Sequence, residues 1–295
     1  MAQDSTDASE RPPLPLELRA ATREKHHALN TEITKRLPLC LSPQVESPVV
    51  YAKGMAAFGQ VYFAFEDVLA TSNAGGHLEP RLQEIYEIIH VPQLIRTSRL
   101  RNDIDVIKCR LDKAAVDEIQ SVEEEAKAFY TRIHDLLSSK PHVLLGYAWA
   151  MYLALFNGGR WIHRQLVSQG SGFWRGEPFP LSFWEFEGNG KDDPEGDHLK
   201  VLFQERFNSA ASLLRCEEKD DVVNETIQLF KLCSEIVHVL DDKMAAAAST
   251  TVPTPSSTPA DSEIHSSLGI TSPIAATWGY LASSYSSLRR LANWA

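Results

Sequence analysis

Apolar residues recur every three or four positions along most of this chain, which is the spacing of helices packed by one face. No stretch shows the strict alternation of apolar and polar residues that is typical of a half-buried strand. The pattern predicts an all-α protein. The predicted helices are 14–36, 49–71, 78–90, 92–111, 116–137, 140–169, 198–214 and 220–246.

The predicted helix 140–169 contains the longest apolar run, VLLGYAWAMYLALF, at residues 143–156. This run is shorter than the ~20 residues that span a bilayer, so it indicates a buried core helix. Two adjacent glycines, Gly158 and Gly159, follow in the stretch LFNGGRWIH. Glycine inside a helix costs about 1 kcal/mol relative to alanine. The pair therefore predicts a bend, or a close approach of another group to the backbone.

The two ends of the chain differ from the helical part. Residues 1–13 are polar and acidic, and we expect them to be a disordered leader that precedes one helical domain at 14–246. Residues 247–272 are rich in Ser, Thr and Pro and are expected to be a disordered linker.

Residues 273–295 predict an amphipathic helix, because apolar residues recur there at spacings of three and four beside a pair of arginines. These positions are Trp278, Leu281, Tyr285, Leu288, Arg289 and Arg290. The helix is too short and too rich in serine to span a membrane. It could lie on a membrane surface, dock on the domain or remain disordered.

Composition excludes some partners and suggests a compartment. The net charge of −10 and the pI near 5.5, with no dense Lys/Arg block, argue against a nucleic-acid partner. The four cysteines, Cys40, Cys109, Cys216 and Cys233, form no CxxC or zinc pattern. With no apolar signal segment at the start, we expect a cytoplasmic protein, with residues 273–295 as its candidate contact with an intracellular membrane.

Four stretches, in this order, resemble the haem oxygenase family: LRAATREKHHALN, VYFAFED, MYLALFNGGRWI and HLKVLFQERFNSA. The resemblance spans residues 14–243. It implies an all-helical domain in which haem b, both cofactor and substrate, lies between a proximal helix with the axial histidine and a kinked distal helix. The implied activity is oxidative cleavage of haem to biliverdin, iron and carbon monoxide, with electrons from a separate reductase.

On the proximal helix, the resemblance makes His26 the axial iron ligand, with His27 as the adjacent alternative. Neighbouring helical residues point about 100° apart, so at most one of the two can face the iron. Arg19 and Arg23 share the helix face of His26, which suits two cations that bind the haem propionates.

A further propionate contact is implied at Lys200, where the family has a lysine. The arginine that the family has one turn later is Gln204 here, so Arg206 is the candidate to replace it.

The distal helix departs from the family pattern. Gly158 and Gly159 would let the backbone lie against the flat macrocycle, but the family's distal aspartate, which organises proton-donating waters, is Leu155 here. Leucine can neither hold water nor relay a proton. Of the other distal positions, Trp149 and Met151 are no longer the family's polar residues, whereas Tyr62 and Tyr152 are retained. Haem binding is therefore expected. Three alternatives to a catalytic function remain open: a haem carrier or sensor, a pseudo-enzyme, or a scaffold without haem.

A di-iron oxygenase is a separate alternative on an all-α scaffold. Two Glu-x-x-His pairs, Glu87 with His90 and Glu235 with His238, together with Glu66, have the residue types of a carboxylate-bridged di-iron site. Against it, His90 is followed by Val-Pro, which ends a helix, and most such pairs are surface contacts.

Overall fold

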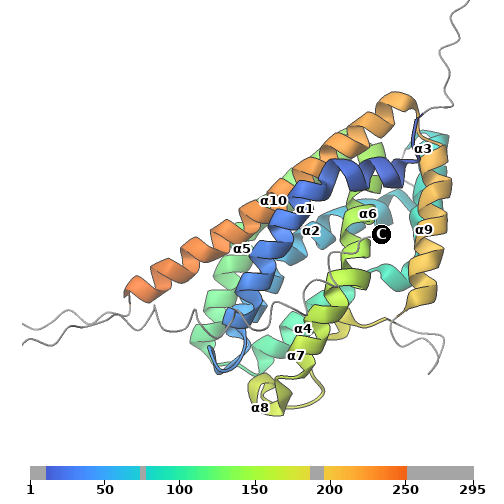
Figure 1. Cartoon of the computed structure of the whole chain (residues 1–295). Coiled ribbons are helices and arrows are strands. Elements are labelled where there is room, and N and C mark those ends of the chain that lie inside the picture. The colour runs from blue at the N-terminus through green and yellow to red at the C-terminus, as the bar shows by residue number, and fades with distance from the viewer. Residues whose placement is uncertain (1–10, 74–77, 187–195, 251–295) are drawn as a thin grey trace, which may run out of the picture. The chain divides into compact units, whose positions relative to one another are not determined.

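The computed structural model describes residues 11–73, 78–186 and 196–250, and this part of the chain is helical without a strand, so the all-α prediction is confirmed (Figure 1). The α-helices are α1 (Leu14–Arg36), α2 (Val49–Asn73), α3 (Pro80–Ile89), α4 (Thr97–Cys109), α5 (Lys113–Ser139), α6 (Leu144–Ala154), α7 (Arg160–Val167), α8 (Gly170–Trp174), α9 (Asp197–Ser212) and α10 (Cys216–Thr250). The 3-10 turns are η1 (Leu37–Cys40), η2 (Pro92–Leu94), η3 (Pro141–Val143) and η5 (Ser182–Trp184), and η4 (Leu155–Gly159) is a π-helical segment.

Several predicted helix boundaries differ from those of the structure. The helix predicted at 140–169 is divided into η3, α6, η4 and α7, and the one predicted at 92–111 begins as the turn η2 and becomes α4 only at Thr97. Helix α10 begins at Cys216 and continues to Thr250, beyond both ends of the helix predicted at 220–246. The predicted C-terminal helix, the linker beyond 250 and residues 1–10 of the predicted leader lie outside the described residues.

Helix α2 lies at the centre of the core, where it packs against α5, α4, α3 and α6. Its side chains Val61, Phe65 and Leu69 are fully buried. Helix α6 is apolar all round because neighbours cover it on every side, and its residues from Leu144 to Leu153 are all buried. The longest apolar run in the sequence is therefore a core helix, as its length predicts.

Helix α1 lies along α10 at one side of this core (Figure 1). The Nε of Arg36 on α1 donates to Asp241 of α10 at 2.8 Å, and Arg11, just before α1, pairs with Asp220 at 2.8 Å. These ion pairs join the two helices near both ends of α1, so the middle of α1, which carries His26, is held in place.

Gly146 on α6 packs closely against α10. A Cβ atom there would overlap Thr226 Oγ1 and lie 3.2 Å from the Val222 carbonyl oxygen. We expect Gly146→Ala to destabilise the protein by about 1–3 kcal/mol, as overpacked cores generally are. Thermal unfolding followed by circular dichroism measures the loss.

Gly54→Ala is the matched control for this substitution, because nothing lies within 4 Å of a Cβ at Gly54 in α2. There the better helix propensity of alanine should leave the Tm unchanged or raise it slightly. Equal Tm values for Gly146→Ala and the unchanged protein would show that α6 and α10 are not tightly packed.

Candidate functional site

The adjacent glycines predicted to bend a helix lie in the π-helical segment η4, between α6 and α7. A π segment inserts a wider turn into an otherwise α-helical rod, and such turns are frequent at functional sites. Where the sequence predicts a bend or a close approach to the backbone, the structure has a widened turn.

Two side chains bind carbonyl oxygens in the turn that leads into η4. The Tyr62 hydroxyl, from α2, donates to the Met151 carbonyl oxygen at 3.0 Å. The Asn157 amide donates to the Leu153 carbonyl oxygen, also at 3.0 Å. Because a π turn shifts the regular hydrogen bonds of the helix, buried carbonyls there need other partners. Tyr62 and Asn157 therefore stabilise the widened turn.

The two glycines have different surroundings. A Cβ at Gly159 would lie 3.4 Å from the Trp184 ring, whereas a Cβ at Gly158 would meet nothing within 4 Å. Ala154, one turn before Gly158, is exposed although its neighbours in the helix are buried. Ala154 and Gly158 therefore form a strip with almost no side chain on the open side of the helix, which we call the bare strip.

Leu155 lies inside the protein. Its side chain is 2% exposed, and Trp149 and Met151 are also buried. Since neighbouring residues on a helix point in different directions, Leu155 and the exposed Ala154 face different surroundings. The position implied for a distal carboxylate is thus occupied by a buried apolar side chain.

On α1, His26 is turned inward and His27 outward. The His26 ring is half-buried and packs edge-on against Phe230 of α10 at a centroid distance of 5.8 Å, while His27 is exposed. Burial, and then the charge of His27, lower the pKa of His26. A lowered pKa keeps the imidazole neutral, which is the form that binds a metal.

The predicted propionate cations lie on two helices. Arg19 and Arg23 are exposed on α1, and neither is in an ion pair with a described residue. The Lys200 ammonium, on α9, donates to the Asn157 side-chain oxygen at 3.1 Å, which places it beside the residue that precedes Gly158. Gln204 is exposed.

Arg206 lies elsewhere. Its guanidinium donates to the His90 carbonyl oxygen at 2.9 Å, at the end of α3. Carbonyls at a helix end lack partners within the helix, so this contact stabilises the junction of α3 and α9. Arg206 therefore has a structural partner at this junction.

The second distal tyrosine, Tyr152, donates to Glu66 Oε1 at 3.1 Å, and the Glu66 carboxylate also binds the start of α4. It accepts hydrogen bonds from the backbone N–H of Arg96 at 2.9 Å and of Thr97 at 2.8 Å, and from the Thr97 hydroxyl at 2.6 Å. Sequence reasoning missed this role, because Glu66 and the helix that it caps are far apart in the chain and no local motif connects them.

These contacts overturn the di-iron alternative. Glu66 is fully engaged by α4 and Tyr152, Glu235 pairs with Arg132 at 2.9 Å, and His90 is the residue at which α3 ends. Among the described residues, no group of three or more His, Cys, Asp or Glu side chains could hold a metal ion. Glu87 accepts instead from Gln83 at 3.0 Å, and His238 lies 3.8 Å from Glu32.

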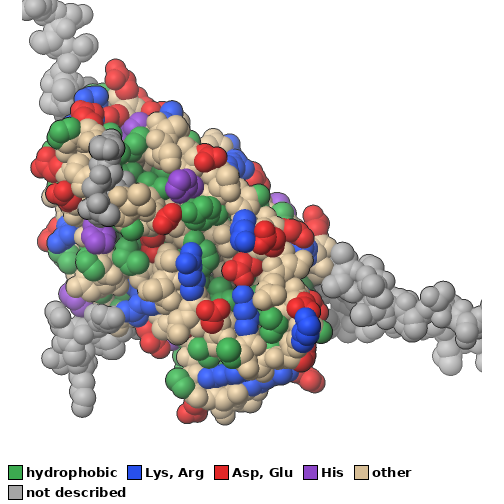
Figure 2. Space-filling view, turned by 180° about the vertical axis from the view of Figure 1, so that it is seen from behind, with side chains coloured by type: hydrophobic (Ala, Val, Ile, Leu, Met, Phe, Trp, Pro, Cys, Tyr) green, Lys and Arg blue, Asp and Glu red, His purple; other side chains and the backbone are tan. Residues whose placement is uncertain are grey.

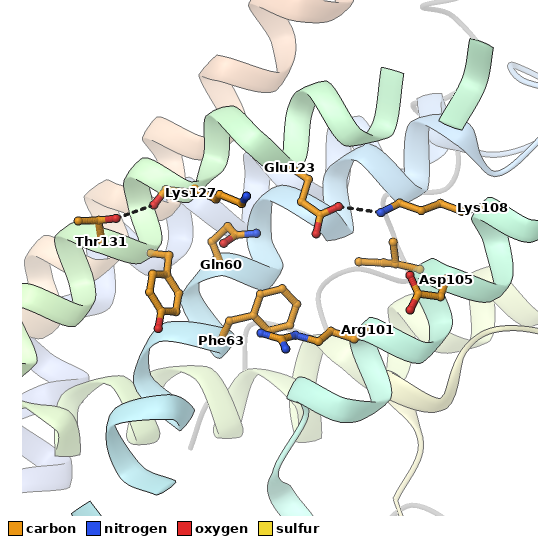
Figure 3. A pocket seen from close by; sticks show the side chains of 10 residues that line it. Gln60, Phe63, Arg101, Asp105, Lys108, Glu123, Lys127 and Thr131 are labelled. Atoms are coloured by element: carbon orange, nitrogen blue, oxygen red, sulfur yellow. Dashed lines mark hydrogen bonds and ion pairs between the residues drawn. The ribbon is translucent and has the colours of Figure 1, made fainter. Parts of the chain in front are cut away.

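A groove of about 460 Å³ opens between α2, α4 and α5 (Figure 3). It contains none of the predicted site residues, and neither α1 nor α6–α7 lines it. Its charged side chains are mostly paired, as Lys108 with Glu123 at 2.7 Å, and its Arg101 lies over the Phe63 ring at 4.7 Å. The groove is therefore separate from the candidate site.

The surface seen in Figure 2 mixes basic and acidic side chains with small hydrophobic areas. No large region of one charge covers this face, in agreement with the absence of a dense basic block in the sequence. In the described residues, no helix combines the length and apolar character needed to cross a bilayer.

Comparisons with known proteins identify a family and a fold. The family model described as "Heme oxygenase" matches residues 13–239. A search of curated proteins found no match. Among solved structures, heme oxygenase 2 from Chlamydomonas reinhardtii, without heme, is 19% identical with a TM-score of 0.63, covering 78% of this chain and 98% of its own. Heme oxygenase-2 from Synechocystis, in complex with heme and NO, is 20% identical with a TM-score of 0.62, covering 80% and 88%. At these identities the likeness shows the fold.

Proposed function

The chain belongs to the haem oxygenase family, and from this we propose that it binds haem b between α1 and the interrupted helix α6–η4–α7, as the substrate of oxidative haem cleavage. The observation that carries the proposal is the bare strip of Ala154 and Gly158. A Cβ at Gly158 would meet nothing within 4 Å. A flat macrocycle needs a helix face without side chains to make van der Waals contact with the backbone.

The residues present fit such a ligand. His26 supplies a half-buried imidazole that its surroundings keep neutral, which favours it over the exposed His27. Arg19, Arg23 and Lys200 supply cations for the propionates. Bound haem would supply the iron that activates oxygen and the carbon skeleton that is cleaved to biliverdin, iron and carbon monoxide, given electrons from a reductase.

The distal residues decide whether this protein is a catalyst. Leu155 offers no proton, and the Tyr62 and Tyr152 hydroxyls both donate inward, to the Met151 carbonyl and to Glu66. The chain therefore holds haem with fewer directed proton donors than a carboxylate at 155 would give. This observation favours, as a second candidate function, a haem carrier or sensor with slow turnover.

A hemin titration tests the proposal. The purified protein should bind hemin with 1:1 stoichiometry and give the absorption spectrum of a histidine-ligated haem. With a reductase supplied, formation of biliverdin identifies the enzyme, whereas a stable complex identifies the carrier. Failure to bind hemin would overturn both.

Gly158→Leu is expected to weaken hemin binding. A side chain at the bare strip would fill the space next to the backbone, so the hemin dissociation constant should rise on the order of ten-fold or more, the equivalent of ~1–3 kcal/mol of overpacking. The measurement is a Soret titration. Gly54→Leu is the control, since Gly54 is as open as Gly158 but lies on α2; equal weakening in both would remove the bare strip from the site.

Arg23→Glu is expected to raise the hemin dissociation constant by a few-fold to roughly tens-fold, because an exposed cation facing a propionate is replaced by a like charge. Lys25→Glu makes the same charge change two residues away, on a different face of α1, and should have little effect. If both variants weaken binding equally, the effect is one of net charge and Arg23 is not a propionate contact.

A further inference from the structure

The groove between α2, α4 and α5 has a buried floor. Gln60 and Ile104 are each 4% exposed and Phe63 is 5% exposed, and all three line the groove. Its volume of about 460 Å³ lies in the range of sites for small molecules. The groove therefore has the size and the apolar surface that such a ligand needs.

Gln60 gives this floor a polar atom without a protein partner. Its Nε2 donates to the Ala56 carbonyl oxygen at 3.1 Å, one turn earlier on α2. Among the described residues, none donates to its Oε1, and this oxygen is not closed off from solvent. Figure 3 shows the Gln60 amide between the Phe63 ring and the stretch of α5 that carries Glu123 and Lys127. A nearly buried acceptor needs a donor, so the floor favours ligands that bring an O–H or N–H group.

Arg101 of α4 is the basic side chain of the groove that has no acidic partner. Its guanidinium lies over the Phe63 ring at 4.7 Å. None of the described carboxylates forms an ion pair with it, although Asp105 lies one turn further along the same helix. A guanidinium on the face of a ring keeps its N–H groups for a carboxylate, which it can bind with two parallel hydrogen bonds. Arg101 is thus placed to bind an anionic group in the groove.

The two lysines of the groove are already paired. Lys108 donates to Glu123 at 2.7 Å and so joins α4 to α5, as Figure 3 shows. Lys127 donates to Glu124 at 2.5 Å on α5 itself. Because these two charges are balanced within the protein, an incoming anion finds its free cation at Arg101.

The arrangement of these groups defines the ligand. In Figure 3 the Phe63 ring lies between Gln60 and Arg101, so a ligand that contacts both polar groups lies along an aromatic side chain. Tyr130 lines the groove from α5, and its hydroxyl donates to Asp67 at 2.7 Å, outside the lining, so Tyr130 contributes its ring. Aromatic side chains pack favourably with other rings. The ligand therefore needs a carboxylate, an aromatic body and a donor at the far end.

We propose that this groove binds a small aromatic carboxylic acid that carries an O–H or N–H group at the end away from its carboxylate. The carboxylate accepts from Arg101, the ring packs on Phe63 and Tyr130, and the donor binds Gln60 Oε1. A small molecule is favoured over the surface of a partner protein because the Gln60 acceptor lies at a nearly buried floor. The proposal does not depend on haem binding.

Titration of the full chain without haem with 4-hydroxybenzoate tests the proposal. In two-dimensional 1H–15N NMR spectra, the chemical-shift changes should be concentrated on residues of the groove and should include the side-chain amide of Gln60. Benzoate lacks the donor for Gln60 and should bind roughly three- to ten-fold more weakly, the effect of losing one hydrogen bond. Phenol lacks the carboxylate for Arg101 and should bind more weakly than either acid.

Two substitutions separate the two polar contacts. Arg101→Gln, at an exposed position, should raise the dissociation constants of both acids by roughly ten-fold or more and keep the preference for 4-hydroxybenzoate. Gln60→Met, which removes the acceptor at similar size, should abolish that preference. Lys25→Gln removes the same charge from an exposed position on α1 and is the matched control, with unchanged binding expected.

Several results would overturn the proposal. Shift changes at Arg19, Arg23 and Lys200 instead of the groove would place the acid at the cations proposed for the haem propionates. Acetate that binds as tightly as the aromatic acids would show that Arg101 takes any carboxylate, such as one on a partner protein. A preference that survives in Gln60→Met, or no shift change in the groove, would also contradict it. If Gln60→Met does not fold, the comparison of the two acids and Arg101→Gln still decide.

Discussion

His26→Ala is expected to abolish the histidine-ligated spectrum of the hemin complex and to weaken hemin binding by at least about ten-fold, because the axial bond is lost. The reason lies in the orientation of α1. His26 is turned toward Phe230 of α10, whereas its neighbour His27 is exposed. Soret titration measures the affinity, and resonance Raman spectroscopy of the ferrous complex detects the iron–imidazole bond.

His27→Ala is the matched control and should keep both the spectrum and the affinity. Adding free imidazole to His26→Ala should restore a nitrogen-ligated spectrum, since the pocket itself is unchanged. An unaltered spectrum in His26→Ala, with loss in His27→Ala, would move the ligand by one residue. Unaltered spectra in both would exclude α1 as the proximal helix.

Leu155→Asp is expected to accelerate biliverdin formation in single-turnover experiments on the order of ten-fold. A positioned proton donor contributes about 100-fold or more in general acid catalysis, and a poorly solvated carboxylate is expected to supply only part of that. The gain comes with a loss of stability of a few kcal/mol, roughly the cost of burying a poorly solvated carboxylate at a position that is 2% exposed. Stopped-flow spectra of the reduced complex measure the rate, and thermal unfolding measures the stability.

Leu155→Asn is the control, because asparagine has the shape of aspartate without a titratable group. It should accelerate biliverdin formation less than Leu155→Asp. Fast biliverdin formation by the unchanged protein, with no acceleration in Leu155→Asp, would show that Leu155 is no handicap and that Tyr62, Tyr152 or backbone groups suffice. No biliverdin from either protein would favour the carrier or sensor.

Most helices could be predicted because their signals are local. Helix α1 begins and ends where the periodicity predicts, with prolines at its start and basic residues in its last turn. Helix α5 begins earlier than predicted, and the reason is again local, because the Asp112 side chain accepts from the Ala115 N–H at 2.9 Å.

The π segment and the start of α4 could not be predicted in the same way, because distant residues determine them. Tyr62 of α2 binds the turn before η4, and Glu66 binds the first N–H groups of α4. Neither partner is near its target in the sequence. The periodicity therefore predicts one continuous helix through η4, and for α4 it predicts a helix without a defined start.

The candidate site was partly predictable for the same reason. His26, Arg19 and Arg23 share one helix face, and the sequence alone shows this. The different surroundings of Gly158 and Gly159 depend on Trp184, which lies in another segment.

A crystal structure of the hemin complex tests the central claim most directly. The account predicts iron bonded to the His26 imidazole, a macrocycle in contact with Ala154 and Gly158, and propionates at Arg19, Arg23 and Lys200. Hemin bound elsewhere, such as in the groove between α2, α4 and α5, or iron bonded to a residue outside α1, would contradict it.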